Sequence, residues 1–141
     1  MKKDIRKTWF FQQPPAEVWE YLTKPELIEQ WLMKCDFKPV AGHKFQFINK
    51  AKIDAYCRVL EVVPDKLLSY SWKKGKSEEE FTVDSVVTWT LTAKNGGTEL
   101  QLQHNGFITL EDQTAHNNGW DYCMNRMTQL INPSSNANTN A

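Results

Sequence analysis

Two histidines in the last third of the chain are the side chains best placed for chemistry. His104 follows Leu100 and Leu102 at alternating positions, so a strand would point it toward the same apolar side. His116 lies one helical turn before Trp120. An imidazole in an apolar wall can hydrogen-bond to a ligand or move a proton, but a buried histidine can also be satisfied by the protein itself. The sequence leaves both interpretations of His104 open.

Other patterns that carry chemistry are missing from the sequence. His43, His104 and His116 lack metal-ligand spacing, and the three cysteines include no Cys-x-x-Cys pair. There is no Gly-x-Ser-x-Gly motif and no glycine-rich phosphate loop. We therefore predict no metal, no cofactor and no catalytic nucleophile, and no reaction is implied.

The charge balance excludes an obvious nucleic-acid partner. The 17 basic side chains are matched by 17 acidic ones, so no basic footprint for phosphates stands out. No run approaches the ~20 apolar residues of a membrane-spanning helix. Three widely spaced cysteines fit a reducing compartment better than a disulfide framework. We expect a cytoplasmic protein with no membrane span.

The elements that must position these side chains follow a simple order. Residues 4–12 alternate as a first strand, and residues 16–31 read as two short helices. Thr23 and Glu26 have the spacing of a capping box around Pro25. After a loop over residues 34–43, further strands are expected at 44–49, 56–63, 66–73, 83–93 and 98–104. Apolar residues at helical spacing then predict a last helix over residues 112–131.

Turn signals join the strands as hairpins. Pro64-Asp65 ends one run, and Asn95-Gly96 tolerates the positive φ that a two-residue hairpin turn requires. Sequential hairpins imply an antiparallel sheet, whose buried face needs the last helix as its partner. We predict an α+β fold in a single domain, residues 1–132, with a curved antiparallel sheet wrapped around a long C-terminal helix. The polar segment 133–141 is predicted to be a disordered tail.

Aromatic side chains predict what the sheet encloses. Five alternate along the strands so as to line the concave face, and two flexible methionines face them from the last helix: Phe45, Phe47, Tyr70, Trp72, Trp89, Met124 and Met127. Either a ligand lies between these groups or they fill the space themselves. Trp120 could likewise close a cavity or fill the core. Gly119 costs roughly 1 kcal/mol in a helix, which indicates a close backbone approach or room for something bulky.

Three groups of residues, in this order, resemble a known family. They are the block Ala16–Trp31, the run Gly42-His43-Lys44-Phe45, and the pattern Leu100-x-Leu102-x-His104-x-Gly106-Phe107 with His116-x-x-Gly119-Trp120 after it. Together they resemble the START-like (SRPBCC, Bet v 1-like) superfamily of helix-grip proteins. The details are similar to the Aha-type, or AHSA-like, subgroup, named for the C-terminal domain of the activator of heat-shock protein 90 ATPase. The resemblance spans about residues 4–131.

The resemblance implies binding of an apolar or amphipathic small molecule between the sheet and the last helix. The ligand-binding residues expected there are Trp31, Phe45, Phe47, Tyr70, Trp72, Trp89, His104, Phe107, His116, Trp120, Met124 and Met127. One alternative is a co-chaperone or stress-response interaction module with a chaperone as partner. Another is a cyclase-like acid–base enzyme that uses the same cavity, with His104 as its proton-transfer group. The protein is expected to be a monomer or a homodimer.

Overall fold

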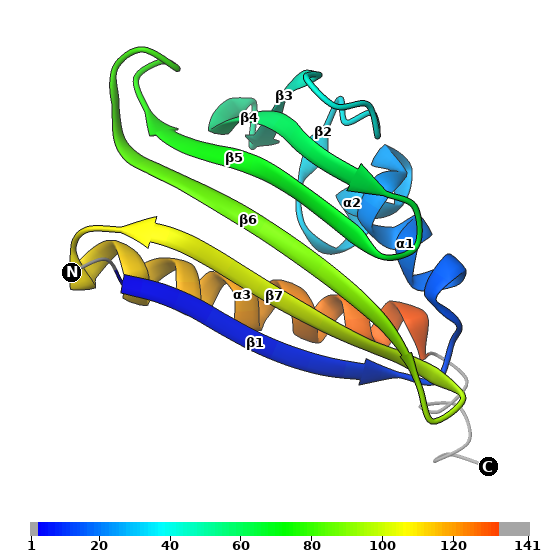
Figure 1. Ribbon diagram of the computed structural model, residues 1–141. Helices are drawn as coiled ribbons and strands as arrows, with labels where there is room; N and C mark the ends of the chain where they lie inside the picture. Colours follow the sequence, from blue (N-terminus) through cyan, green and yellow to red (C-terminus); the bar gives the residue numbers. More distant parts are fainter. Residues whose placement is uncertain (1–2, 133–141) are drawn as a thin grey trace.

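The computed structural model describes residues 3–132, and within them the chain forms one seven-stranded sheet and three helices (Figure 1). The elements are β1 (Lys3–Phe11), α1 (Pro15–Thr23), α2 (Pro25–Trp31), β2 (Lys34–Cys35), β3 (Lys44–Asn49), β4 (Lys52–Val63), β5 (Leu67–Gly75), β6 (Phe81–Lys94), β7 (Gly97–Phe107) and α3 (Leu110–Ile131). The predicted tail, residues 133–141, lies outside the described residues.

The sheet is antiparallel throughout its seven described strands. Their order is β1-β7-β6-β5-β4-β3-β2, so each strand from β2 to β7 lies beside its neighbour in sequence, and β1 closes one edge against β7. The register places Trp72 opposite Ser85, and Val87 opposite His104. Because side chains alternate between the two faces of a strand, Tyr70 and Trp72 of β5 share the inner face.

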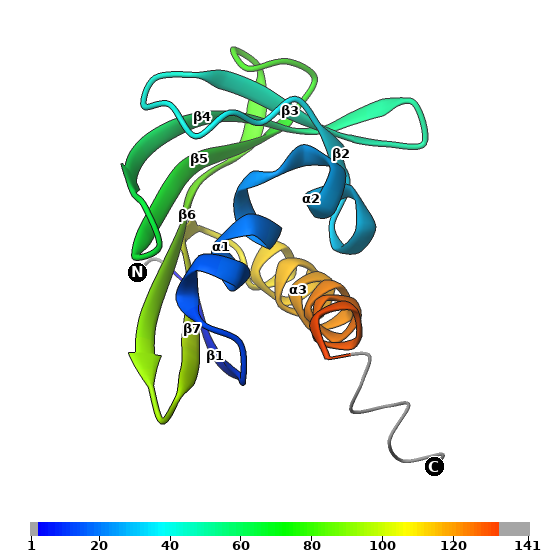
Figure 2. The same ribbon diagram turned by 90° about the vertical axis from the view of Figure 1, so that its right-hand side faces the viewer.

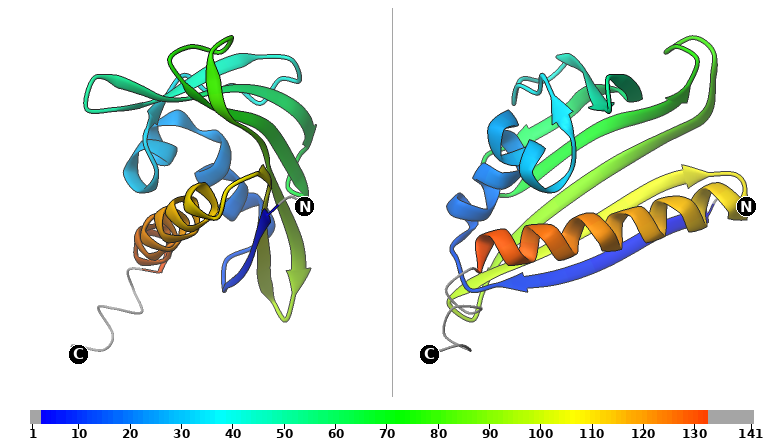
Figure 3. Two further views of the ribbon diagram at one scale, coloured as in Figure 1. Left: turned by 90° about the vertical axis from the view of Figure 1, so that its left-hand side faces the viewer. Right: turned by 180° about the vertical axis from the view of Figure 1, so that it is seen from behind.

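The sheet curves around α3, and α1 and α2 cover the rest of the same concave side (Figures 2 and 3). α3 contributes Trp120, Met124 and Met127, each at most 3% exposed, to the core between helix and sheet. The predicted α+β helix-grip fold is therefore confirmed. No helix in the described part of the chain combines the length and the apolar character needed to cross a membrane.

Two turns that carry recognisable signals are present where the sequence predicts them. Asn95 and Gly96 have φ of 52° and 80° between the paired residues Lys94 and Gly97. The Lys66 N–H donates to the Val63 carbonyl at 2.9 Å and closes the turn at Pro64-Asp65. These turns set the register that brings the aromatic side chains onto one face.

The strands differ most from the expectation at two places, β4 and the segment before β3. β4 begins at Lys52 because Lys50 and Ala51 form a tight turn with φ of 53° and 66°, although neither residue favours positive φ. The predicted loop over residues 34–43 contains the short strand β2, which pairs with β3. Six strands therefore follow the helix pair, one more than the sequence predicts.

Helix capping also differs. Thr23 does not cap α2: its hydroxyl donates to the Trp19 carbonyl at 2.8 Å, and Lys24 occupies the N-cap position without a side-chain bond. α3 starts at Leu110, earlier than predicted, because the Thr109 hydroxyl accepts a hydrogen bond from the Asp112 N–H at 3.1 Å. This earlier start leaves the inner stripe of the helix unchanged.

Candidate ligand-binding site

Most of the concave face is filled by the protein's own side chains. The rings of Phe45 and Tyr70 lie 5.4 Å apart at 77°, and those of Trp89 and Trp120 lie 5.4 Å apart at 86°. Such edge-to-face contacts are the preferred packing of aromatic side chains. The indole N–H of Trp89 donates to the Tyr70 hydroxyl at 3.0 Å, so this polar pair is satisfied within the core.

His104 lies inside this packed region, and both of its ring nitrogens are occupied. The Trp120 indole N–H donates to Nδ1 at 2.9 Å, which fixes Nδ1 as the acceptor. Nε2 therefore carries the proton of the neutral ring and donates it to the Ser85 hydroxyl at 2.8 Å. Ser85 in turn donates to the Trp72 carbonyl at 2.8 Å. Every donor in this series of hydrogen bonds has an acceptor, so His104 has no hydrogen bond left for a ligand.

The surroundings keep His104 neutral. It is 0% exposed, and burial, with a smaller contribution from His116, lowers its pKa to about 2. A charged imidazole here would lose its hydration without gaining an anionic partner. His104 thus links β6, β7 and α3 as a structural hydrogen-bonding group.

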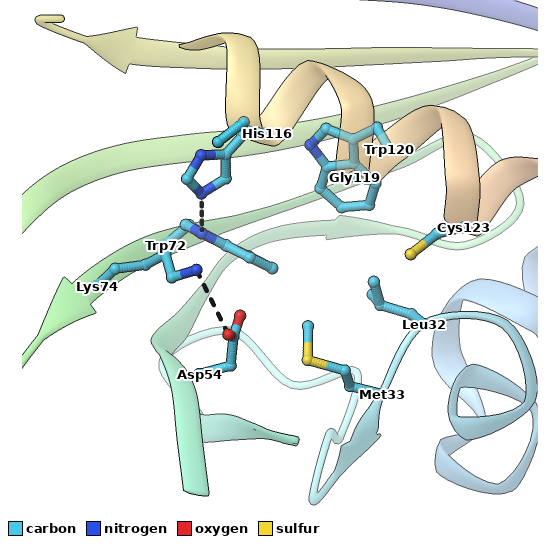
Figure 4. Close-up of a pocket in the computed structure, with 10 residues that line it drawn as sticks. Leu32, Met33, Asp54, Trp72, Lys74, His116, Gly119, Trp120 and Cys123 are labelled. Carbon is cyan, nitrogen blue, oxygen red and sulfur yellow. Dashed lines mark hydrogen bonds and ion pairs between the residues drawn. The ribbon is translucent and has the colours of Figure 1, made fainter. Parts of the chain in front are cut away.

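A small cavity remains beside this network, between β5 and α3 (Figure 4). Its volume is about 150 Å³, and it is partly open to solvent. The lining residues are Leu32, Met33, Asp54, Trp72, Lys74, Ala115, His116, Gly119, Trp120 and Cys123. They come from the segment directly after α2, from β4 and β5, and from α3.

His116 is the imidazole that the cavity exposes. Its Nδ1 lies 2.8 Å from the Asp112 carbonyl, one turn back in α3, and its Nε2 accepts the Trp72 indole N–H at 3.3 Å. Burial is the main cause that lowers the pKa of His116, and the nearby Lys74 acts in the same direction. The ring is neutral at pH 7, so its Nε2 is a hydrogen-bond acceptor on the cavity wall.

Gly119 lines the cavity from α3. A Cβ built at this position would have no atom within 4 Å outside the backbone of its own helical turns and its chain neighbours. No neighbouring backbone therefore requires a glycine here. The structure removes the close backbone approach as an explanation of its helix-propensity cost; Gly119 is exposed, and the space beside it opens to solvent as well as to the cavity.

The rim of the cavity carries one ion pair and one thiol. Lys74 Nζ lies 3.4 Å from Asp54 Oδ1, and both side chains are about a quarter to a third exposed. Burial raises the pKa of the Cys123 thiol to about 11, so this cysteine is a weak nucleophile at pH 7. Within the described part of the chain, no group of three or more His, Cys, Asp or Glu side chains could hold a metal ion.

The structure brings three of the twelve predicted ligand-binding residues to the cavity wall: Trp72, His116 and Trp120. The other nine do not line it, and each is at most 3% exposed: Trp31, Phe45, Phe47, Tyr70, Trp89, His104, Phe107, Met124 and Met127. The sequence interpretation missed Leu32, Met33, Asp54, Lys74, Ala115 and Cys123 as lining residues. Lys74 carried a usable signal, because it follows Trp72 by two positions in the same strand.

A curved antiparallel sheet that encloses a long C-terminal helix, with a cavity between them, defines a START-like helix-grip protein. Residues 12–132 match the family described as activator of Hsp90 ATPase homolog 1-like protein. The chain belongs to this family. Comparison with proteins of curated function gives no match.

Several solved structures share the fold. Protein MLL2253 from Mesorhizobium loti is 34% identical with a TM-score of 0.85, over 93% of this chain and 98% of that one. CalU16 from Micromonospora echinospora is 22% identical with a TM-score of 0.79, over 95% and 79% of the two chains. The Aha1 dimer from Colwellia psychrerythraea is 15% identical with a TM-score of 0.77, over 92% and 96%. The last two likenesses establish the fold alone.

Proposed function

We propose that the protein binds a small, flat, apolar molecule in the cavity between β5 and α3. The observation that carries this proposal is the partly open cavity that the indoles of Trp72 and Trp120 border, beside the exposed Gly119 of α3. Aromatic walls with a few polar groups are typical of small-molecule sites. The ligand-facing imidazole in this proposal is His116, because His104 has no free hydrogen-bonding position.

The size of the cavity restricts the ligand. Its volume of about 150 Å³ is below the roughly 300–1,000 Å³ of drug-sized pockets. An apolar cavity of about 150 Å³ can hold benzene. A single aromatic ring, or the apolar end of an amphipathic molecule, therefore fits the enclosed part, and a longer ligand would extend past the ion pair of Lys74 and Asp54.

Calorimetric titration with toluene and indole tests the proposal. For ligands of this size we expect dissociation constants of about 0.1–1 mM, within the usual limits of ligand efficiency. The heat-capacity change should be negative because apolar surface is buried.

A matched pair of variants locates the binding site. In Gly119→Leu the new side chain occupies the cavity, and affinity should fall at least about tenfold, or 1.4 kcal/mol. Asn118→Leu places the same side chain at the neighbouring position of α3, which is exposed like Gly119 but does not line the cavity, and should bind like the wild type. Absence of binding to the wild type, or equal effects of the two variants, would refute the proposal.

A protein-interaction module is the second candidate function. Its support is a set of exposed apolar side chains at the start of α3: Ile108 is 78% exposed and Leu110 is 64% exposed. Ile108 also lines a groove of about 310 Å³ together with Phe81 of β6. The Aha1 of Colwellia psychrerythraea, which shares the fold, is a dimer in its solution structure, so self-association and chaperone stimulation are the activities to measure.

Sedimentation equilibrium and the ATPase rate of a purified heat-shock protein 90 test this second candidate. Ile108→Glu should reduce either activity, whereas Val40→Glu, at another exposed apolar position, should not. A monomeric wild type that leaves the ATPase rate unchanged would remove this candidate.

A further inference from the structure

The two imidazoles of the site differ in how firmly their hydrogen bonds are held. Their ring centroids lie 5.4 Å apart. His104 makes bonds of 2.8 and 2.9 Å and is fully buried. His116 makes one bond of 2.8 Å to Asp112, but its bond from the Trp72 indole is 3.3 Å long. At 3.3 Å the Trp72–His116 bond is longer than the 2.9 Å bond from Trp120 to His104, which also joins an indole N–H to an imidazole nitrogen.

The tautomer of His116 follows from its strong bond. The Asp112 carbonyl can only accept, so Nδ1 must carry the proton and Nε2 must present its lone pair. The Trp72 indole nitrogen can only donate. The cavity wall thus offers one donor and one acceptor side by side, as Figure 4 shows for Trp72 and His116.

Among common polar groups, a hydroxyl matches this pair best. A hydroxyl oxygen can accept from the Trp72 N–H while its proton is donated to His116 Nε2. A carbonyl or ether could only accept, and it would leave the His116 lone pair without a donor. A protonated amine could donate to His116 but has no lone pair for the Trp72 N–H. Unpaired polar groups in an apolar cavity are costly, so these alternatives bind less well.

Charge at the rim favours a neutral ligand. Lys74 is already paired with Asp54 at 3.4 Å, so the two charges offset each other beside the cavity. A carboxylate ligand would bring a second negative charge close to Asp54, and its desolvation would oppose binding. A neutral hydroxyl avoids both costs.

We propose that the cavity selects a small aromatic ring bearing a hydroxyl group, a ligand of the phenol class, which bridges Trp72 Nε1 and His116 Nε2. This inference rests on the proposed function and specifies the chemistry of its ligand. The ring would occupy the apolar part of the cavity beside Gly119 and Trp120, and the hydroxyl would replace the long Trp72–His116 bond.

Four probes of similar ring size separate the possibilities: phenol, anisole, toluene and benzoate. For the wild type we expect phenol to bind about five- to tenfold more tightly than anisole or toluene, the usual worth of one net hydrogen bond, because two bonds form and the Trp72–His116 bond is lost. The ratio of the anisole and phenol dissociation constants is the measured quantity, because changes in cavity size affect both probes alike.

Two variants with matched controls test the named atoms. His116→Leu removes the acceptor and should bring the ratio close to one, because phenol and anisole can both still accept from the Trp72 N–H. Trp72→Phe removes the indole N–H, and phenol should keep its preference there, because the freed His116 Nε2 still accepts its proton and anisole has none to give. Trp9→Phe on β1 and His43→Leu before β3 make the same chemical changes at residues that do not line the cavity. These controls should keep the wild-type ratio.

Nuclear magnetic resonance supplies a readout in the wild type. The indole ¹H–¹⁵N signal that disappears in Trp72→Phe should shift more with phenol than with toluene, and the His116 Nε2 nitrogen should shift with it. If all probes bind equally, or His116→Leu keeps the preference for phenol, the hydroxyl inference fails while the proposed function stands. Tighter binding of benzoate than of phenol would overturn the neutral-ligand argument. If no probe binds, the proposed function fails and the inference fails with it.

Discussion

The buried His104 should make the fold sensitive to mild acid, with a size that the structure allows us to work out. An unfolded chain exposes the histidine, whose ordinary pKa is about 6.5. In the folded protein burial lowers the pKa of His104 to about 2. The folded state therefore stays neutral at this position while the unfolded state takes up a proton. The stabilising contribution is fully present above about pH 6.5 and declines as the pH falls from there toward 2.

Between pH 7 and pH 5 this one group should lower the free energy of unfolding by about 2 kcal/mol. Urea unfolding followed by tryptophan fluorescence at pH 7, 6 and 5 measures the change. The comparison protein is His104→Leu, which keeps the apolar volume and cannot bind a proton. Its absolute stability should be lower, because Trp120 and Ser85 lose their partner.

The deciding measurement is the change in the free energy of unfolding between pH 7 and pH 5, compared between the wild type and His104→Leu. Carboxylates titrate in both proteins and cancel in this difference. His116, whose pKa is also lowered, cancels to a first approximation, although His104 contributes to its surroundings. A wild type and a variant that lose the same stability, within about 0.5 kcal/mol, would show that His104 becomes protonated in the folded state. The proposed hydrogen-bond chain through Ser85 would then be wrong.

Three further substitutions test other parts of the structure by urea unfolding at pH 7. Gly119→Ala should raise the free energy of unfolding by about 0.8–1 kcal/mol, because alanine is the better helix former and its Cβ meets nothing; a loss of stability would show that the space is not empty. Trp120→Phe should cost about 1–3 kcal/mol, since the buried Nδ1 of His104 loses its donor, and a neutral result would contradict that bond. Ala51→Gly should raise the free energy of unfolding by up to about 1 kcal/mol, because glycine adopts a φ of 66° without strain. No gain in stability would show that the turn has another conformation.

The fold could be predicted because its main signals are local. Alternation along β3, β5, β6 and β7 and the helical period of α3 are visible in the sequence, and Asn95-Gly96 identifies its turn. The turn at Lys50 and Ala51 could not be predicted in this way, because both residues adopt positive φ without the residue types that favour it. The strand β2 has only two residues, which is too short for a period to show.

The candidate site was less predictable, because it depends on volume and not on pattern. Alternation shows that Phe45, Tyr70, Trp72 and Trp89 share a face, but it does not show which rings fill the space between sheet and helix. Asp54 was missed because β4 starts before the expected boundary. Leu32 and Met33 belong to the segment directly after α2, whose position is set by tertiary packing.

Empty volume by itself does not distinguish a binding site from a packing defect, so the proposed function rests on the polar groups of the wall as well. A dry defect is lined by apolar groups, and polar groups in a core are normally paired at good geometry, as they are around His104. Beside the cavity, the Trp72 donor and the His116 acceptor are paired only at 3.3 Å. The helix carries a glycine at the same place without a backbone contact that requires it. Weak pairing and low helix propensity at one point each reduce stability, and a ligand that fills the space and bridges the two nitrogens would compensate for both.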